Sequence, residues 1–273
     1  MLTVGRISYV NCYPVYGAID RGIVPLSGRI VNGIPTALNR QMAEGTLDVS
    51  VVSAVEYARD AGRYLLLPDL AISCDGPVRS VMLFSKVPAE TLGRRTVVVS
   101  KSSMTSVALL ELLFEHVWRT TPNFVLGDAE VTDIARFDDR YDARLVIGDA
   151  ALVLATASRY PYAYDLGETW KEWTNLPFVF AVWVAQRSCA VADALHVHAQ
   201  LIESRNWGIT HLDILAEQAH AATGVSPQEC TTYLAGLDYR LSYHHLAGLT
   251  EFFRRLVRCG RIPNGTLAFL TAA

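Results

Sequence analysis

Five hydroxyl side chains lie close together in the segment 100–106, which reads Ser-Lys-Ser-Ser-Met-Thr-Ser. The β-branched run 96–99 before it predicts a strand, and the leucine-rich sequence after it predicts a helix through Leu113. A helix start carries unpaired N–H groups and the positive end of the helix dipole, so hydroxyl donors at this place favour a small anion. One hydroxyl is enough to cap the helix, which is the alternative role of these residues. The candidate anion ligands are Ser103, Thr105 and Ser106.

Two carboxylates are candidates for a general base, and each has a structural alternative. Glu56 follows Ser53 with the Ser-x-x-Glu spacing of a capping box, which favours a role at the start of a helix. Asp75 lies in a polar connection and has the alternative role of a turn residue. All seven histidines lie at or beyond His116, so a base in the N-terminal part of the chain is not a histidine.

Cysteine and histidine spacing argues against a disulfide framework and against a metal site. The five cysteines are scattered and include no Cys-x-x-Cys pair. His196 and His198 are two residues apart in a predicted helix, and His244 and His245 are adjacent. Neither pair has the one-face spacing that metal ligands on a helix require. We therefore expect no metal and no disulfide-linked partner.

Composition excludes several classes of partner. The chain has 273 residues, of which 51% are hydrophobic and 19% charged, and its net charge is -3. This length can bury one or two substantial cores. The charge is too small to indicate nucleic acid or a membrane surface as partner, and no stretch is long and apolar enough to span a bilayer. The first ten residues alternate like a strand and lack the basic and apolar regions of a signal peptide, so we expect a cytoplasmic protein.

The elements that must position the candidate residues alternate between strands and helices. Four strands are predicted in the first eighty residues, at 2–10, 29–34, 47–52 and 64–67. Helices are predicted to follow the first three, beginning near Val15, Pro35 and Ser53. A second series has strands at 96–99, 124–126, 145–147 and 164–166. Such alternation with short links predicts parallel strands wound with crossover helices.

Two apolar runs with strong strand propensity bracket the second series, at 78–85 and 178–185. We expect them to cross between two lobes, one outward and one back. Beyond Gln186 the sequence is helical, and this tail is expected to pack onto the first lobe. The expected fold class is α/β, with the two-lobed fold of periplasmic binding proteins (type II) and a helical C-terminal segment. Residues 1–85 plus 184–273 form the discontinuous first lobe, and residues 86–183 form the second.

Ligand sites in such folds lie between the lobes, at the carboxyl ends of parallel strands. In the first lobe this rule selects Asn11, the turn at Ser53 and the segment 75–80. In the second lobe it selects 100–106 and the pair Gly148-Asp149, where Asp149 has the alternative role of an N-cap. These loops are small, polar and mostly uncharged, which suits a ligand held by hydrogen bonds and helix ends.

Six segments of the first eighty-one residues carry a resemblance to a known family. They are 5–14 (Gly-Arg-Ile-Ser-Tyr-Val-Asn-Cys-Tyr-Pro), 33–39 (Gly-Ile-Pro-Thr-Ala-Leu-Asn), 45–48 (Gly-Thr-Leu-Asp), 53–58 (Ser-Ala-Val-Glu-Tyr-Ala), 66–70 (Leu-Leu-Pro-Asp-Leu) and 76–81 (Gly-Pro-Val-Arg-Ser-Val). Together with the serine-rich turn and 147–152 (Ile-Gly-Asp-Ala-Ala-Leu), they resemble the chorismate dehydratases of the futalosine route to menaquinone. The resemblance covers most of the first 185 residues, and the helical tail matches only in general character.

The resemblance implies a lyase that removes water from chorismate and leaves 3-[(1-carboxyvinyl)oxy]benzoate, the first step of that route, without metal or organic cofactor. The family's proposed key residues fall on Asn11, in Val-Asn-Cys, and on Ser80, in Arg-Ser-Val. Asn11 is expected to orient the substrate and to stabilise developing negative charge through its amide N–H groups. Ser80 is expected to bind a carboxylate or to assist the leaving hydroxyl. The remaining substrate-binding candidates are Ser53, Ser103, Thr105, Ser106, Gly148 and Asp149.

The base of this reaction is left open by the sequence. Glu56 and Asp75 are the possible side chains, and a substrate carboxylate held over its own ring is the alternative.

Three alternative functions also remain open. A small-anion solute-binding protein has the same fold, although the missing signal peptide argues against export. The 1,4-dihydroxy-6-naphthoate synthase of the same pathway resembles the chain more weakly and is expected to use a histidine of the second lobe. Between Val78 and Ala185 the only histidine is His116, which lies inside a predicted helix. A regulatory effector-binding domain is the third alternative, but the chain has no attached DNA-binding segment.

Overall fold

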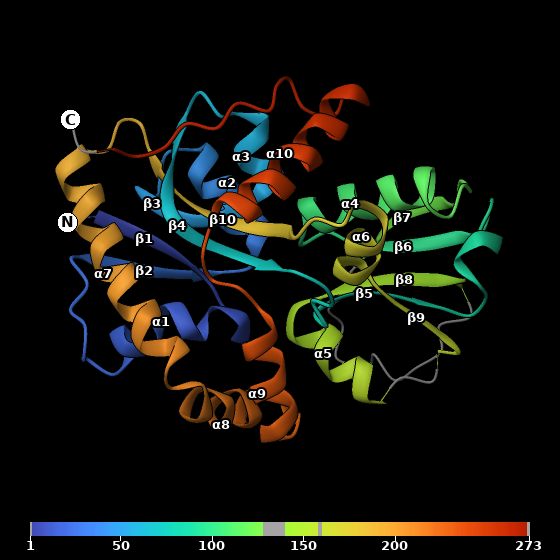
Figure 1. The fold of residues 1–273 in the computed structure, drawn as a ribbon, viewed down its shortest axis with the longest axis horizontal. Coiled ribbons are helices and arrows are strands. Elements are labelled where there is room, and N and C mark those ends of the chain that lie inside the picture. The colour runs from blue at the N-terminus through green and yellow to red at the C-terminus, as the bar shows by residue number, and fades with distance from the viewer. Residues whose placement is uncertain (1, 128–139, 158–159, 272–273) are drawn as a thin grey trace.

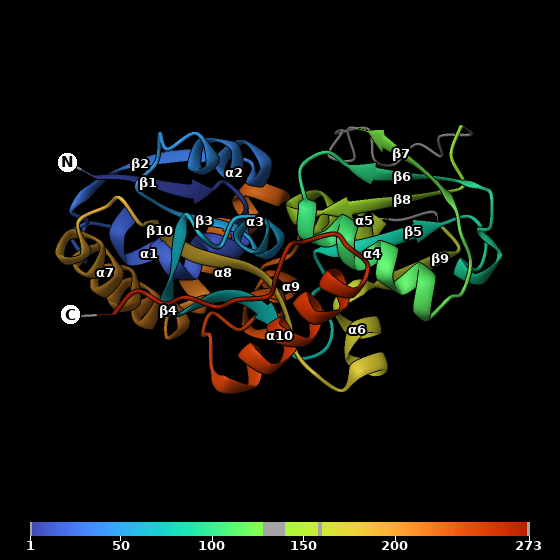
Figure 2. The same ribbon diagram turned by 90° about the horizontal axis from the view of Figure 1, so that it is seen from above.

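Two five-stranded mixed sheets lie side by side along the long axis of the molecule, and helices cover each of them (Figure 1). The computed structural model describes residues 2–127, 140–157 and 160–271 of the chain. The view from above separates the same two lobes, with the N-terminus and the C-terminus both on the first (Figure 2). The two-lobed α/β architecture expected from the sequence is confirmed.

The first sheet has the strand order β2-β1-β3-β10-β4. Its strands are β1 (Leu2–Ile7), β2 (Gly28–Gly33), β3 (Val49–Ser53), β4 (Tyr64–Cys74) and β10 (Phe178–Gln186). Strand β1 pairs in parallel with β2 and β3, whereas β10 is antiparallel to β3 and β4. Three helices follow the first three strands: α1 (Tyr13–Asp20), α2 (Pro35–Ala43) and α3 (Ala54–Arg59). The predicted alternation therefore brings the ends of β1 and β3 to one edge.

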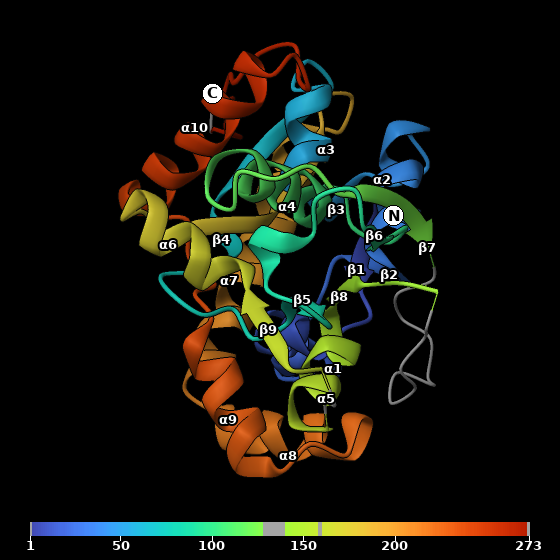
Figure 3. The same cartoon turned by 90° about the vertical axis from the view of Figure 1, so that its right-hand side faces the viewer.

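The second sheet has the order β7-β6-β8-β5-β9. Its strands are β5 (Val81–Ser85), β6 (Thr96–Ser100), β7 (Asn123–Gly127), β8 (Ala143–Ile147) and β9 (Tyr162–Asp165). Strand β6 pairs in parallel with β7 and β8, and β5 is antiparallel to β8 and β9. Its helices are α4 (Met104–His116), α5 (Gly148–Ala157) and α6 (Leu166–Thr174). Helices α4 and α6 cover one face of this sheet and α5 covers the other (Figures 1 and 3).

The chain passes between the sheets after β4 and again before β10. Strand β4 continues to Cys74, whereas the sequence predicted a strand at 64–67 and then a polar connection. Pro68 is tolerated inside β4 because this strand lies at the edge of its sheet. The predicted crossing strand 78–85 contributes β5, which lies in the second sheet. Sheet membership thus changes before Val81, earlier than the predicted lobe boundary at residue 85.

Four helices form the C-terminal part: α7 (Val191–Ile209), α8 (Leu212–Thr223), α9 (Pro227–Gly236) and α10 (Tyr243–Arg258). Helix α7 packs against α1, and α10 packs against β10. Buried Arg205 on α7 forms an ion pair with Asp69 at the bend of β4, with 3.0 Å between Nη2 and Oδ2. Helix α10 also reaches the second lobe beside α6, where the Arg255 guanidinium lies 3.8 Å from the Trp173 ring centroid (Figure 2). Within the described part of the chain, no helix combines the length and apolar character needed to cross a bilayer.

Candidate active site

A pocket lies between the two lobes and is lined by residues of both. The free space between its walls, counted together with the open solvent at its mouth, is about 540 Å³. The apolar lining residues are Ile7, Pro35, Ile72, Val78, Val81, Ile147, Phe180 and Ala181, together with the Tyr9 ring. The polar lining residues are Asn11, Ser53, Ser80, Ser103 and Ser106, and Gly148 completes the wall. None of the described residues that line the pocket carries a charge.

Helix starts converge on this pocket. Pro35 is the first residue of α2, Ser103 is the N-cap of α4, and Gly148 is the first residue of α5. Ser53, the N-cap of the short helix α3, lies in the same wall. Each longer helix contributes a positive dipole end of about half an elementary charge, which favours anionic groups. The pocket therefore offers positive potential and hydrogen-bond donors without a lysine or arginine in its described lining.

The serine-rich turn serves both as a helix cap and as pocket wall. The Ser103 hydroxyl accepts a hydrogen bond from the Ser106 backbone N–H at 3.1 Å and donates to the Ser106 hydroxyl at 2.8 Å. Both side chains are buried and line the pocket. Thr105 does not line it, because its hydroxyl faces the other lobe and accepts the Val55 N–H at 3.1 Å.

The Ser53 hydroxyl oxygen accepts two hydrogen bonds within its own lobe. The donors are the Glu56 N–H at 3.3 Å and the Asn39 side-chain amide at 2.9 Å. With these two acceptor positions occupied, the Ser53 O–H is the group left to face the pocket.

Asn11 and Ser80, the two family positions, meet in the same pocket. Asn11 lies in the short 3-10 helix η1 (Val10–Cys12), and its buried Oδ1 has no hydrogen-bond partner among the described residues. The Ser80 carbonyl accepts the N–H of Gly148 at 2.8 Å, which ties the first residue of α5 to Ser80. Burial raises the pKa of Tyr233 on α9, and nearby Ser80 partly offsets that rise. The C-terminal tail, which the sequence left without a role at the site, therefore lies directly behind Ser80.

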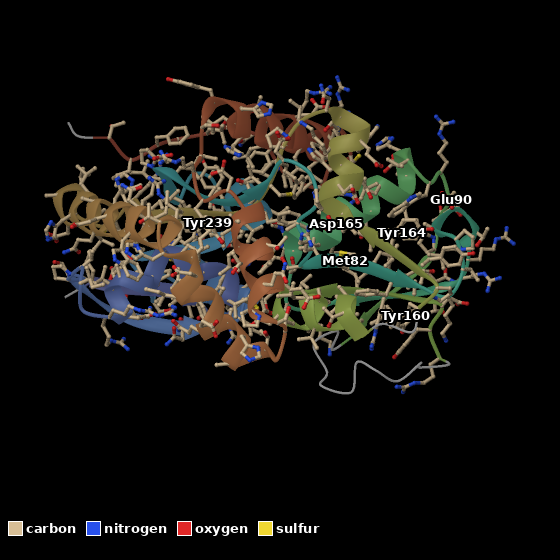
Figure 4. All side chains as sticks on the ribbon, turned by 60° about the horizontal axis from the view of Figure 1, so that its bottom comes forward. Met82, Glu90, Tyr160, Tyr164, Asp165 and Tyr239 are labelled. Carbon is tan, nitrogen blue, oxygen red and sulfur yellow. The ribbon has the colours of Figure 1, made fainter. Side chains whose placement is uncertain are left out.

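Asp165 holds the turn that presents Ser80, and the sequence analysis missed it. Its carboxylate accepts four backbone N–H groups: those of Val78 (3.0 Å), Arg79 (2.6 Å), Gly167 (2.9 Å) and Glu168 (3.1 Å). It is the N-cap of α6, where Figure 4 labels it. Burial raises its pKa, and the four N–H groups act in the opposite direction. The pattern Asp-Leu-Gly-Glu was the available signal, because an acid followed three residues later by glutamate is typical of a helix start.

Neither candidate base lines the pocket. The Glu56 side chain is buried, and its carboxylate accepts a hydrogen bond from the Tyr64 hydroxyl at 3.2 Å. Of the predicted capping box, only the bond from the Glu56 N–H to the Ser53 hydroxyl forms. Burial raises the pKa of Glu56. The Asp75 carboxylate is half exposed and lies 2.6 Å from the Lys171 ammonium, which lowers the pKa of Asp75. An exposed carboxylate with a lowered pKa is a weak base, and this one faces a different hollow, beside α9.

Gly148 lines the pocket and Asp149 contacts the opposite lobe. Gly148 has a left-handed φ of 63°, and a Cβ at this position would lie 2.8 Å from the Tyr9 ring, so only glycine fits. Helix α5 begins at Gly148, which places Asp149 in the first turn. The Asp149 carboxylate accepts the backbone N–H of Val10 at 3.0 Å.

Potential metal ligands lie away from the pocket. Among the described residues, one group of three has ligand atoms close enough to share an ion: Glu115, His116 and Cys259, where α4 and α10 end. All five cysteines are unpaired.

Comparison with known proteins shows the family of the chain. A protein-family model described as menaquinone biosynthesis matches residues 2–258. The chain is 32% identical over 269 residues to the chorismate dehydratase of Thermus thermophilus, which covers 93% of this chain and 94% of that protein.

Solved structures share the fold. A protein from Archaeoglobus fulgidus superposes with a TM-score of 0.81 at 20% identity, covering 96% of this chain and 98% of that one. The alkanesulfonate-binding protein of Xanthomonas axonopodis pv. citri, bound to MOPS, gives a TM-score of 0.69 at 15% identity, with 98% and 96% covered. The expected fold of the periplasmic-binding-protein type is confirmed.

Proposed function

The chain belongs to the menaquinone-biosynthesis family, and we propose that it acts as a chorismate dehydratase, a lyase that converts chorismate into 3-[(1-carboxyvinyl)oxy]benzoate and water. The observation that carries the proposal is an interlobe pocket whose described lining is uncharged, although three helices of eight or more residues begin at its wall. The cytoplasm is the proposed compartment, and five unpaired thiols are consistent with a reducing one.

The pocket suits a compact dicarboxylate. Chorismate carries two carboxylates on a small ring, and an apolar wall with hydroxyl donors at helix starts can hold both without burying an unpaired cation. Ser103, Ser106 and the start of α4 are assigned to one carboxylate. Ser53, Ser80 and the start of α5 at Gly148 are assigned to the other end of the substrate.

The reaction removes a proton from carbon 3 and expels the hydroxyl from carbon 4. The electrons of the C–H bond become part of the aromatic ring, the hydroxyl leaves with its bonding pair, and a proton completes the water. Asn11 stabilises the negative charge that develops, through its amide N–H groups, and Ser80 assists the leaving hydroxyl.

The proton acceptor is a carboxylate of the substrate itself in this proposal. Two observations support it: neither Glu56 nor Asp75 lines the pocket, and the described lining includes no other acid. A carboxylate held over its own ring is close to the proton on carbon 3 and can accept it, so no side-chain base is needed. Thr105 and Asp149, which the sequence offered as ligands, are assigned to contacts between the lobes because their side chains bond backbone N–H groups of the first lobe.

Glu56→Gln tests this assignment, and turnover is expected to stay within about two-fold of wild type. Because burial raises the pKa of Glu56 in the folded state, the folded protein binds this proton more tightly than the unfolded chain. Wild-type stability therefore falls as the pH rises through the interval between the unfolded and folded pKa values, and the glutamine variant lacks this loss. The variant should unfold at a higher temperature than wild type at about pH 7, and the gain should shrink towards about pH 4. Loss of turnover with an unchanged melting temperature would identify Glu56 as the base.

Incubation with chorismate tests the function itself. We expect loss of chorismate and appearance of 3-[(1-carboxyvinyl)oxy]benzoate, followed by liquid chromatography and mass spectrometry. Binding of chorismate without product would favour a solute-binding protein of the same fold. The naphthoate synthase alternative has little support, because His116 is exposed and stacks on Trp173 outside the pocket.

A further inference from the structure

Two side chains of the second lobe cap helix starts of the first lobe across the pocket. The Asp149 carboxylate, in the first turn of α5, accepts the N–H of Val10, the first residue of η1, at 3.0 Å. The Thr105 hydroxyl, in the first turn of α4, accepts the N–H of Val55, in the first turn of α3, at 3.1 Å. N–H groups in a first helical turn have no partner within their own helix. Both contacts join the first lobe to the second, so both exist only while the lobes are closed.

The two contacts differ in what they hold. Val10 immediately precedes Asn11, and η1 is a single turn of three residues in which the Cys12 N–H donates to the Tyr9 carbonyl at 3.1 Å. The Tyr9 ring also packs against Gly148, next to Asp149. The second lobe therefore holds both residues that precede Asn11.

Thr105 holds a different element. Val55 belongs to α3, whose N-cap Ser53 is already fixed by hydrogen bonds with Asn39 inside the first lobe. Loss of the Thr105 contact thus leaves Ser53 with its own anchors, whereas loss of the Asp149 contact removes the acceptor at the start of η1.

We propose that Asp149 is a positioning residue for Asn11, so that closure of the lobes places the Asn11 amide for reaction, whereas Thr105 only stabilises closure. The proposal rests on the proposed function, in which Asn11 stabilises developing charge. A small displacement of such a group costs up to about 100-fold in rate.

Three variants separate positioning from closure: Asp149→Ala, Asp149→Asn and Thr105→Val. Asp149→Ala should lower kcat with saturating chorismate by about 10- to 100-fold. Asp149→Asn keeps an oxygen that can accept the Val10 N–H and should recover most of that loss. Thr105→Val should raise KM several-fold and change kcat by less than about three-fold, because weaker closure reduces apparent affinity. The control is Arg95→Gln, which weakens the ion pair of Arg95 with Asp142 inside the second lobe, outside the pocket lining, and should leave both constants unchanged.

Hydrogen exchange of the substrate-free proteins gives a readout that does not depend on turnover. The amides of residues 9–12 should exchange faster in Asp149→Ala than in wild type, and by a smaller factor in Thr105→Val, where the Asp149 contact is lost only in the fraction of molecules that open. Equal exchange in wild type and Asp149→Ala would overturn the inference. So would an effect of Asp149→Ala on KM alone, or failure of Asp149→Asn to recover kcat. If wild type made no product, the proposed function would fail, and the exchange of residues 9–12 would still decide whether Asp149 holds the turn.

Discussion

Replacing Asn11 by alanine is expected to lower kcat by about 10²–10³-fold with the fold intact, because removal of one donor to developing negative charge typically has this effect. The Asn11 side chain lies in the pocket wall on a single 3-10 turn, and its buried Oδ1 has no partner among the described residues. The unpaired oxygen can only accept a hydrogen bond, so the donors to the developing charge are the two N–H groups of the same amide. Initial rates with chorismate and the thermal unfolding midpoint measure the two parts of the prediction.

Asn11→Asp is the matched control for shape. Aspartate has the same size but lacks the amide donors, and it adds a negative charge beside a substrate with two carboxylates. It should be as inactive as Asn11→Ala, with KM raised further. Wild-type turnover in Asn11→Ala would contradict the assigned role, and an unfolded variant would be recognised by its circular dichroism.

Asp165→Ala is expected to have the largest effect on stability. Four backbone N–H groups lose their acceptor, and a buried unsatisfied donor costs about 1–3 kcal/mol. Partial access of water reduces the sum, so we expect the free energy of unfolding to fall by about 3–5 kcal/mol. The turn before Ser80 loses its anchor at the same time, and kcat/KM should fall by about 100-fold. Urea unfolding and chorismate turnover at a temperature where the variant is folded test both effects.

Two variants bracket this result. Asp165→Asn retains one acceptor oxygen but places an amide donor opposite a backbone N–H. Its free energy of unfolding should therefore lie between those of wild type and Asp165→Ala. Asp142→Ala removes another carboxylate that accepts a backbone N–H, that of Thr96 at 3.0 Å, but its side chain is 29% exposed. We expect about 1 kcal/mol of destabilisation and unchanged turnover from it. Asp165→Ala with the stability of Asp142→Ala would contradict the anchoring role.

The sequence by itself determined the features that depend on neighbours along the chain. Apolar runs predicted the strands, and the hydroxyl residues at 103, 105 and 106 predicted a cap for α4, which Ser103 provides. Because parallel strands end at one edge of a sheet, the loops after β1, β3, β6 and β8 were predicted to meet, and all four contribute to the pocket wall.

Only the tertiary structure decided which hydroxyl lines the pocket and which hydroxyl or carboxylate bonds the other lobe. Ser106 and Thr105 are adjacent hydroxyl residues at one helix start, yet Ser106 lines the pocket and Thr105 bonds a residue 50 positions away. Asp149 and Asp165 bond N–H groups 139 and 87 positions away. Residue spacing along the chain determines where a helix begins. The hydrogen-bond partners of the side chains in its first turn depend on how the two lobes pack. For that reason the sequence predicted which loops meet, whereas the contacts of Asn11, Asp149 and Asp165 followed only from the fold.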